Sequence, residues 1–214
     1  ESLSESFNGN ASRALKVLEK GFEVADLEEF KTILRIAIFQ PSHSLLNFQK
    51  IYNLWTRKGK VPLKPNPVKQ KVFLLTDFTA DNLVPLISTF WGAQGVETEI
   101  LLSSFNSVDQ TILDPSSTLY TSKPDIVVWV TSNDWFQQFT GKHTLVEIKN
   151  LEKAKETFFN LIDKLKSQSS AEVLVSNIPG QGYPLPSGSL SYHSMVGLDL
   201  AVSSFNVWLA KNNS

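Results

Sequence analysis

The sequence predicts an α/β protein in which a three-layer parallel sheet follows an N-terminal helical appendage. From Gln70 onward, short runs rich in β-branched and aromatic residues alternate with helical patterns, which is typical of βαβ units. Before that point the apolar residues recur only at the spacing of helices. With 214 residues, of which 42% are hydrophobic and 19% charged, the chain can bury a full core.

The appendage is predicted to contain three short helices between Ala11 and Trp55. Asp26 is a candidate N-cap of the second helix, with Glu29 three residues further on. Pro41 and Ser42 separate the second helix from the third. Glycine and three prolines between residues 59 and 69 disfavour both helix and central strand. We therefore predict an appendage over 1–58, a linker over 59–69 and an α/β domain over 70–214.

The α/β domain is predicted to hold four strands, at 71–75, 97–102, 125–130 and 172–175. Helices are expected at 81–92, 151–167 and about 191–211, with a Gly/Pro loop at 178–189. No fifth strand is predicted in this sequence. Ligands of open parallel sheets bind beyond the carboxyl ends of the strands, so the loops 76–80, 131–135 and 178–189 are expected to meet there.

Composition excludes several classes of function. A formal net charge of −1 gives no basic surface for gripping phosphates, so we expect no nucleic-acid partner. The absence of cysteine removes thiolate catalysis and is consistent with a cytoplasmic protein. No apolar run approaches the roughly 20 residues that cross a bilayer, so no membrane association is expected. The three histidines are far apart, and we predict no metal site and no cofactor.

A polar segment after the second predicted strand is the most informative stretch. Asn106, Gln110, Asp114 and Ser117 recur every three or four residues, so in a continuous helix they would share one face. A row of polar side chains next to a buried strand indicates a functional site. The alternative is a solvated helix face, or a capped turn fixed by Asp114 and Pro115.

Several motifs together resemble the N-terminal region of the FkbH-like proteins. They are the run at 73–79, the central motif at 106–110 with 113–120, Lys123-Pro124-Asp125, and the late run at 204–209. The resemblance implies an SGNH-hydrolase-like domain, hence a flavodoxin/SGNH-like sheet. It further implies that the full-length protein carries a haloacid-dehalogenase-like domain, which loads a glyceryl unit onto an acyl carrier protein in polyketide assembly. No strand predicted in this sequence is followed by the Asp-x-Asp motif of that second domain.

The resemblance also shows where this chain departs from active SGNH enzymes. Their Gly-Asp-Ser motif falls on Thr76-Asp77-Phe78, so Phe78 replaces the nucleophilic serine and Thr79 is the nearest hydroxyl. Thr131-Ser132-Asn133-Asp134 resembles the Gly-x-Asn-Asp element, which makes Asn133 a candidate oxyanion donor. The Asp-x-x-His element that would follow a fifth strand is not present.

Each candidate site residue has a structural alternative. The candidate catalytic residues are Thr79, Asn133 and His193, and the candidate substrate- or partner-binding residues are Asp77, Asn106, Gln110, Ser117 and Asp134. Thr79 could instead cap the helix that follows it, and the pair at 133–134 could form an Asx turn. His193, at the start of the last predicted helix, could simply be exposed.

Three functions follow from this sequence. The first is a catalytically reduced SGNH-like domain of an FkbH-like protein or polyketide synthase loading region, which supports glyceryl or acyl loading by docking an acyl carrier protein or neighbouring synthase domains. The second is an active acyltransferase or esterase that uses a rim hydroxyl. The third is a structural adaptor that acts through the helix at 45–55, because that helix is apolar on more than one face.

Overall fold

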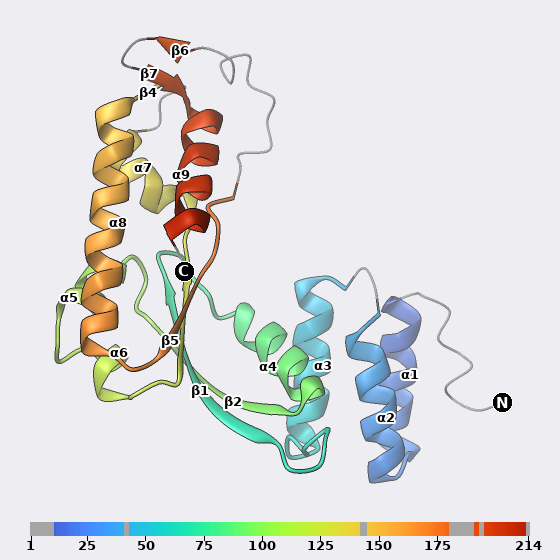
Figure 1. Cartoon of the computed structure of the whole chain (residues 1–214). Coiled ribbons are helices and arrows are strands. Elements are labelled where there is room, and N and C mark those ends of the chain that lie inside the picture. Colours follow the sequence, from blue (N-terminus) through green and yellow to red (C-terminus); the bar gives the residue numbers. More distant parts are fainter. Residues whose placement is uncertain (1–10, 41–42, 142–144, 180–190, 193–194, 213–214) are drawn as a thin grey trace. The chain divides into compact units, whose positions relative to one another are not determined.

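A computed structural model describes residues 11–40, 43–141, 145–179, 191–192 and 195–212. The helices are α1 (Ala11–Val24), α2 (Leu27–Ile38), α3 (Leu45–Arg57), α4 (Leu83–Gln94), α5 (Val108–Leu113), α6 (Thr118–Thr121), α7 (Asn133–Thr140), α8 (Ile148–Gln168) and α9 (Leu198–Asn212) (Figure 1). The strands are β1 (Val68–Thr76), β2 (Val96–Leu102), β3 (Ile126–Val130), β4 (Leu145–Glu147), β5 (Glu172–Val175), β6 (Ser191–Tyr192) and β7 (Met195–Gly197).

The main sheet has the strand order β2-β1-β3-β5, and β1–β3 and β3–β5 pair in parallel. Val72 faces Ile126 at one end of the β1–β3 register and Thr76 faces Val130 at the other. The parallel α/β fold predicted from the sequence is thus confirmed. Strand β3 is an unbroken apolar run, as expected of a strand covered on both faces.

Two boundaries differ from the sequence prediction. Strand β1 begins at Val68, so the last residues of the predicted linker are extended backbone. The last helix begins at Leu198 rather than near 191, because the preceding residues supply β6 and β7 to a small antiparallel sheet of order β4-β7-β6. Short strands of two or three residues carry too little periodicity to be predicted.

The chain divides into two compact units. The described residues up to Lys71, with Ala80–Ile100, form the first unit, and Val72–Thr79 with the described residues from Leu101 onward form the second. Strands β1 and β2 therefore contribute residues to both units. No helix in the described part of the chain is long and apolar enough to cross a membrane.

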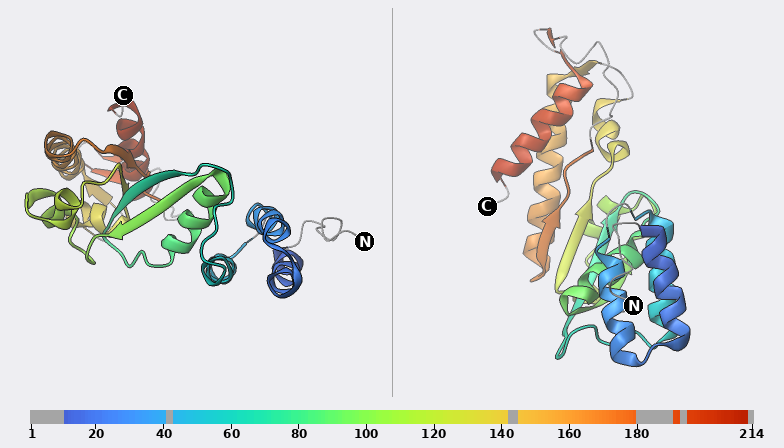
Figure 2. Two further views of the ribbon diagram at one scale, coloured as in Figure 1. Left: turned by 90° about the horizontal axis from the view of Figure 1, so that it is seen from below. Right: turned by 90° about the vertical axis from the view of Figure 1, so that its right-hand side faces the viewer.

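The first unit is built from helices α1 to α4. Helices α1 and α2 lie side by side (Figures 1 and 2), and Leu18, Phe30 and Ile51 are fully buried between the helices. The carboxylate of Asp26 accepts a hydrogen bond of 2.9 Å from the backbone N–H of Glu29, which confirms the predicted N-cap.

The core of the second unit is a cluster of aromatic side chains. Phe158 on α8 stacks on Trp129 of β3, with ring centroids 4.4 Å apart, and meets Trp135 and Phe205 edge-on. Helices α8 and α9 lie side by side in both Figures 1 and 2. The side-chain amide of Asn206 on α9 donates to the carbonyl of Ile178 and accepts from its N–H, both at 2.9 Å, and so fixes the chain after β5.

Candidate functional site

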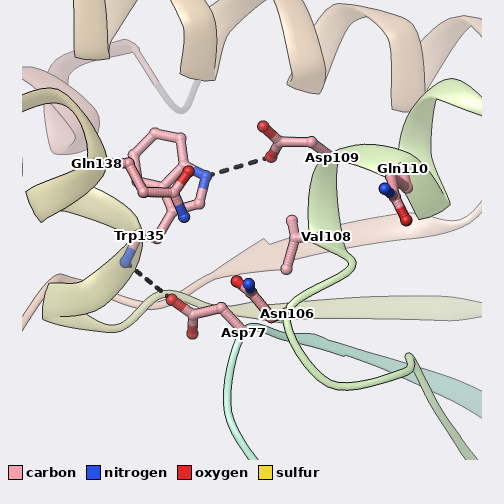
Figure 3. A pocket seen from close by; sticks show the side chains of 7 residues that line it. All are labelled: Asp77, Asn106, Val108, Asp109, Gln110, Trp135 and Gln138. Atoms are coloured by element: carbon pink, nitrogen blue, oxygen red, sulfur yellow. Dashed lines mark hydrogen bonds between the residues drawn. The ribbon is translucent and has the colours of Figure 1, made fainter.

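A cavity of about 290 Å³ opens in the second unit, where residues following β1 and β2 meet helix α7. Three segments line it: the turn after β1, the turn and first residues of α5, and α7 (Figure 3). This is the carboxyl end of the parallel strands, where the sequence predicted a site. The lining residues are Asp77, Asn106, Val108, Asp109, Gln110, Trp135 and Gln138.

Asp77 directly follows β1, and only 7% of its surface is exposed. Its Oδ2 accepts a 2.5 Å hydrogen bond from the hydroxyl of Ser132 and a 3.0 Å bond from the backbone N–H of Trp135. The donors belong to the N-cap residue and to the first turn of α7, where free amides and the helix dipole favour a carboxylate. Asp77 therefore ties the end of β1 to the start of α7.

The other carboxylate oxygen of Asp77, Oδ1, makes no hydrogen bond to Ser132 or to α7. Oδ1 is buried and has no hydrogen-bond partner among the described residues. Buried polar atoms in folded proteins nearly always have a partner, and an unpaired one costs free energy. An additional donor is therefore expected near this atom.

The α5 side of the cavity begins with a strained turn. Asn106 has a positive φ of 51°, a left-handed conformation that asparagine tolerates better than most residues. The hydroxyl of Ser107 donates to the carbonyl of Ser104 at 2.7 Å, which closes this turn. One turn into α5, the carboxylate of Asp109 accepts a 3.3 Å bond from the indole N–H of Trp135. Trp135 thus donates to Asp77 from its backbone N–H and to Asp109 from its indole N–H.

Hydroxyl side chains fix the ends of neighbouring strands to one another. Ser103 after β2 accepts from the N–H of Thr76 at 3.0 Å and donates to its carbonyl at 3.1 Å. Ser176 after β5 accepts a 3.0 Å bond from the N–H of Thr131, and the Thr131 hydroxyl donates to the Ser176 carbonyl at 3.1 Å. These side chains replace sheet hydrogen bonds just past the last paired residues, so the loops leave the sheet in fixed directions.

Of the sequence-predicted site residues, Asp77, Asn106 and Gln110 line this cavity together. Thr79 is exposed and Asn133, the first residue of α7, is half-buried, and neither lines it. His193 lies outside the described residues.

The remaining two predicted binding residues do not line the cavity. Ser117 is the N-cap residue of α6, and its hydroxyl donates to the carbonyl of Thr111 at 2.7 Å. Asp134 is exposed in the first turn of α7. Their roles as site residues stay predictions that the structure does not test.

The expectation that the polar row shares one helix face is wrong. Helix α5 ends at Leu113, and Asp114 accepts hydrogen bonds from the N–H and hydroxyl of Ser116 at 2.9 and 2.7 Å. Those two bonds hold the pKa of Asp114 below its usual range. Asp114 and the following proline therefore interrupt the helix, which is the capped turn weighed as the alternative.

Sequence reasoning missed Trp135 and its helix. From the sequence, residues 131–134 resemble an oxyanion element, with an Asx turn as the alternative, whereas Asn133 begins helix α7, with Ser132 as its N-cap. The apolar spacing of Trp135, Phe136 and Phe139 after a serine was the available signal. Asp109 lies inside the central motif at 106–110, which does not distinguish it as a site residue, and Gln138 is an isolated polar residue on a short helix with no distinguishing pattern.

The described residues of the second unit include no histidine. His43 lies in the first unit, where its Nε2 donates to the carbonyl of Ala37 at 2.6 Å. Within the described ranges, no group of three or more His, Cys, Asp or Glu side chains is placed to hold a metal ion. The described residues that line the cavity offer two carboxylates, three carboxamides and an indole, and none of them carries a hydroxyl or thiol group that could act as a nucleophile.

The fold and the position of this cavity define an α/β domain with a cavity at the carboxyl edge of a parallel sheet, where ligands of such sheets bind. The chain belongs to the FkbH family: residues 71–181, just over half of the chain, match the model described as FkbH, N-terminal domain. The match includes every residue that lines the cavity.

One solved structure shares the fold. It is described as the N-terminal part of the protein BF1531 from Bacteroides fragilis, containing a phosphatase domain and complexed with Mg. The TM-score is 0.60 at 17% sequence identity, and the alignment covers 79% of this chain and 42% of that one. This chain therefore corresponds to less than half of that structure. No curated protein sequence matched the chain.

Proposed function

We propose that this chain is a catalytically reduced SGNH-like domain of an FkbH-like protein, which supports acyl or glyceryl loading by docking an acyl carrier protein. The observation that carries this proposal is the use of Asp77. In active SGNH enzymes the equivalent aspartate precedes the nucleophilic serine, whereas here Phe78 follows it. The Asp77 carboxylate is bonded to the first turn of α7.

The geometry of the turn after β1 supports the loss of catalysis. The hydroxyl of Thr76 donates to the carbonyl of Phe78 at 2.8 Å, so the backbone is held where a nucleophile would project. Thr79, the next hydroxyl, is exposed and does not line the cavity. A serine or threonine nucleophile needs a base within hydrogen-bond reach, and none is described beside Thr79.

Docking is supported by exposed apolar side chains on the segment that lines the cavity. Phe105, which precedes α5, is 70% exposed, and Leu113, the last residue of α5, is 57% exposed. Large apolar side chains left in water are common at protein interfaces. A carrier protein that contacts both would present its attached group to the adjacent cavity.

Titration of a fluorescently labelled acyl carrier protein against the chain tests this proposal. We expect saturable binding that is weakened about tenfold or more, equal to about 1.4 kcal/mol, in a Phe105→Ala/Leu113→Ala double variant. Phe159→Ala is the matched control, because Phe159 is also an exposed aromatic residue but lies on α8. Equal affinity for all three proteins would exclude docking at α5.

The rival function is an active acyltransferase or esterase that uses Thr79. It requires the exposed hydroxyl to turn toward the cavity when a substrate binds. Turnover of an acyl-carrier thioester that disappears in Thr79→Ala, with carrier affinity unchanged, would establish this rival and overturn the non-catalytic reading.

A further inference from the structure

One face of helix α9 is exposed and uncharged along most of its length. Leu200 is 43% exposed and Val207 is 54% exposed. The small residues Ser203 and Ala210 are also exposed, and the four residues follow one another at spacings of three, four and three. Residues at these spacings lie on one side of an α-helix, so they form a single stripe along α9.

The neighbouring helix α8 shows how a solvated helix face differs from this stripe. The two helices lie side by side and bury their apolar faces in the same core (Figures 1 and 2). The exposed residues of α8 are largely charged, as expected of a helix that faces water. They include Glu152, Lys153, Glu156, Asp163 and Lys166. The uncharged stripe of α9 therefore suits contact with another protein surface better than contact with water.

The stripe is complementary to itself when two copies of α9 run in opposite directions. Pairing about Phe205, the midpoint of the stripe, sets Leu200 of one copy opposite Ala210 of the other. It likewise sets Val207 opposite Ser203. Each large side chain then faces a small one, which lets the two helices pack closely. A parallel pair would set large against large and small against small, and would leave gaps between the small residues.

The charges at the ends of α9 favour the same antiparallel arrangement. Asp199 lies in the first turn and Lys211 in the last, and neither forms an ion pair with another described residue. In an antiparallel pair, Asp199 of one copy lies at the same level as Lys211 of the other, at both ends of the contact. The two helix dipoles also oppose each other. A partner carrying charge of one sign would be attracted at one end and repelled at the other.

We propose that the exposed stripe of α9 is an interface between two copies of this chain, which pair as an antiparallel, two-fold symmetric dimer. Both copies use the same stripe, as a closed dimer with two-fold symmetry requires. The contact involves one helix face from each copy and buries less surface than a tight complex. We therefore expect a dissociation constant on the order of 100 μM. This inference goes beyond carrier docking and does not depend on it.

Sedimentation equilibrium of the purified chain, from about 10 μM to about 1 mM, tests the proposal. We expect an equilibrium between monomer and dimer, without larger species. Val207→Glu buries a charge in the contact and should weaken dimerisation about tenfold or more. Phe159→Glu is the matched control, because Phe159 is 49% exposed on α8, and it should leave dimerisation unchanged. Circular dichroism checks that both variants remain folded.

Exchange of the end charges tests the orientation of the two helices. Asp199→Lys and Lys211→Asp should each weaken dimerisation about threefold or more at low salt, because each places like charges at both ends of the antiparallel pair. The double variant Asp199→Lys/Lys211→Asp restores opposite charges and should dimerise about as tightly as the unmodified chain. A parallel pair would gain nothing from the second exchange.

Four results would overturn the proposal. They are a monomer throughout the concentration range, association that continues beyond the dimer, a Val207→Glu chain that dimerises as tightly as the unmodified chain, and a double-exchange variant that dimerises no more tightly than the single exchanges. The docking proposal is judged separately, because its readout is carrier affinity and its variants change Phe105 and Leu113.

Discussion

The two units of this chain use buried polar side chains in different ways. In the first unit, the hydroxyl of buried Thr89 donates to the carbonyl of Pro85 within the same helix, at 2.8 Å. In the second unit, buried Asp77 is bonded to residues 55 and 58 positions further along the sequence. The first pattern satisfies a polar group locally, whereas the second holds separate loops together around a cavity.

The cavity depends on the core of the second unit. The ring of Trp135 packs against Phe158 and Phe205, and its two N–H groups hold Asp77 and Asp109. Packing in the second unit therefore positions the cavity directly. In the first unit the core residue Trp55 also lines a cavity, together with Lys60 and Glu97, but its indole N–H donates to the backbone carbonyl of Val61 and not to a carboxylate.

The largest loss of stability is expected when the Phe158 side chain is removed. Phe158→Ala removes a fully buried ring that contacts Trp129, Trp135 and Phe205, and should lower the free energy of unfolding of the second unit by about 3–5 kcal/mol. Amide hydrogen exchange measured over each unit checks this. Phe159→Ala, at the exposed neighbouring position, should change it by less than about 0.5 kcal/mol. Equal losses of unfolding free energy in Phe158→Ala and Phe159→Ala would show that Phe158 is not part of the buried core.

A smaller effect is expected in the first unit at Gly92. A Cβ atom there would lie 2.4 Å from the Trp55 ring, whose indole N–H is held by the carbonyl of Val61 at 2.9 Å. Because the ring cannot easily move, Gly92→Ala should destabilise the first unit by about 1–3 kcal/mol despite the better helix propensity of alanine. Thermal unfolding followed by circular dichroism measures the change.

Gly21→Ala is the control for that prediction. The added Cβ would meet the flexible end of Ile33 at 2.8 Å, so a rotamer change can relieve the contact. We expect Gly21→Ala to destabilise the first unit less than Gly92→Ala does. A Gly92→Ala protein as stable as the unmodified chain would show that Trp55 does not pack against α4 as described.

Loss of the Asp77 carboxylate should affect the cavity more than the core. Asp77→Ala leaves the Ser132 hydroxyl and the Trp135 N–H without their acceptor, at a cost of about 1–2 kcal/mol. Hydrogen exchange in the first turn of α7 should accelerate. Asp134→Ala, which removes an exposed carboxylate from the same turn, should produce a smaller acceleration. Unchanged exchange in Asp77→Ala would contradict the anchoring role.

The smallest effect concerns alkaline pH and Tyr120. Burial raises the pKa of Tyr120 above its ordinary value of 10.0, and its hydroxyl donates to the carbonyl of Ile112 at 2.6 Å. The folded chain therefore holds the phenol proton more tightly than the unfolded chain. This contribution to stability is complete below pH 10 and is lost as the pH rises through the folded pKa. Tyr120→Phe should remove that part of the pH dependence in denaturant titrations.

The sequence predicts the parallel sheet well and the site only in part. Four strands and their helices are visible because buried parallel strands are continuous apolar runs and helix α8 shows a regular apolar face. Asp77, Asn106 and Gln110 follow strand ends, so topology alone brings them to one edge. Trp135 and Asp109 belong to the cavity through hydrogen bonds between distant segments, and no local pattern encodes such bonds.

We propose that the end of β1 anchors α7 and does not carry out acyl transfer. Measurement of acyl-carrier thioester hydrolysis and acyl transfer by the purified chain tests it most directly, with Thr79→Ala assayed beside it. The account predicts that both proteins give the uncatalysed background rate. A rate above background that falls to background in Thr79→Ala would contradict it.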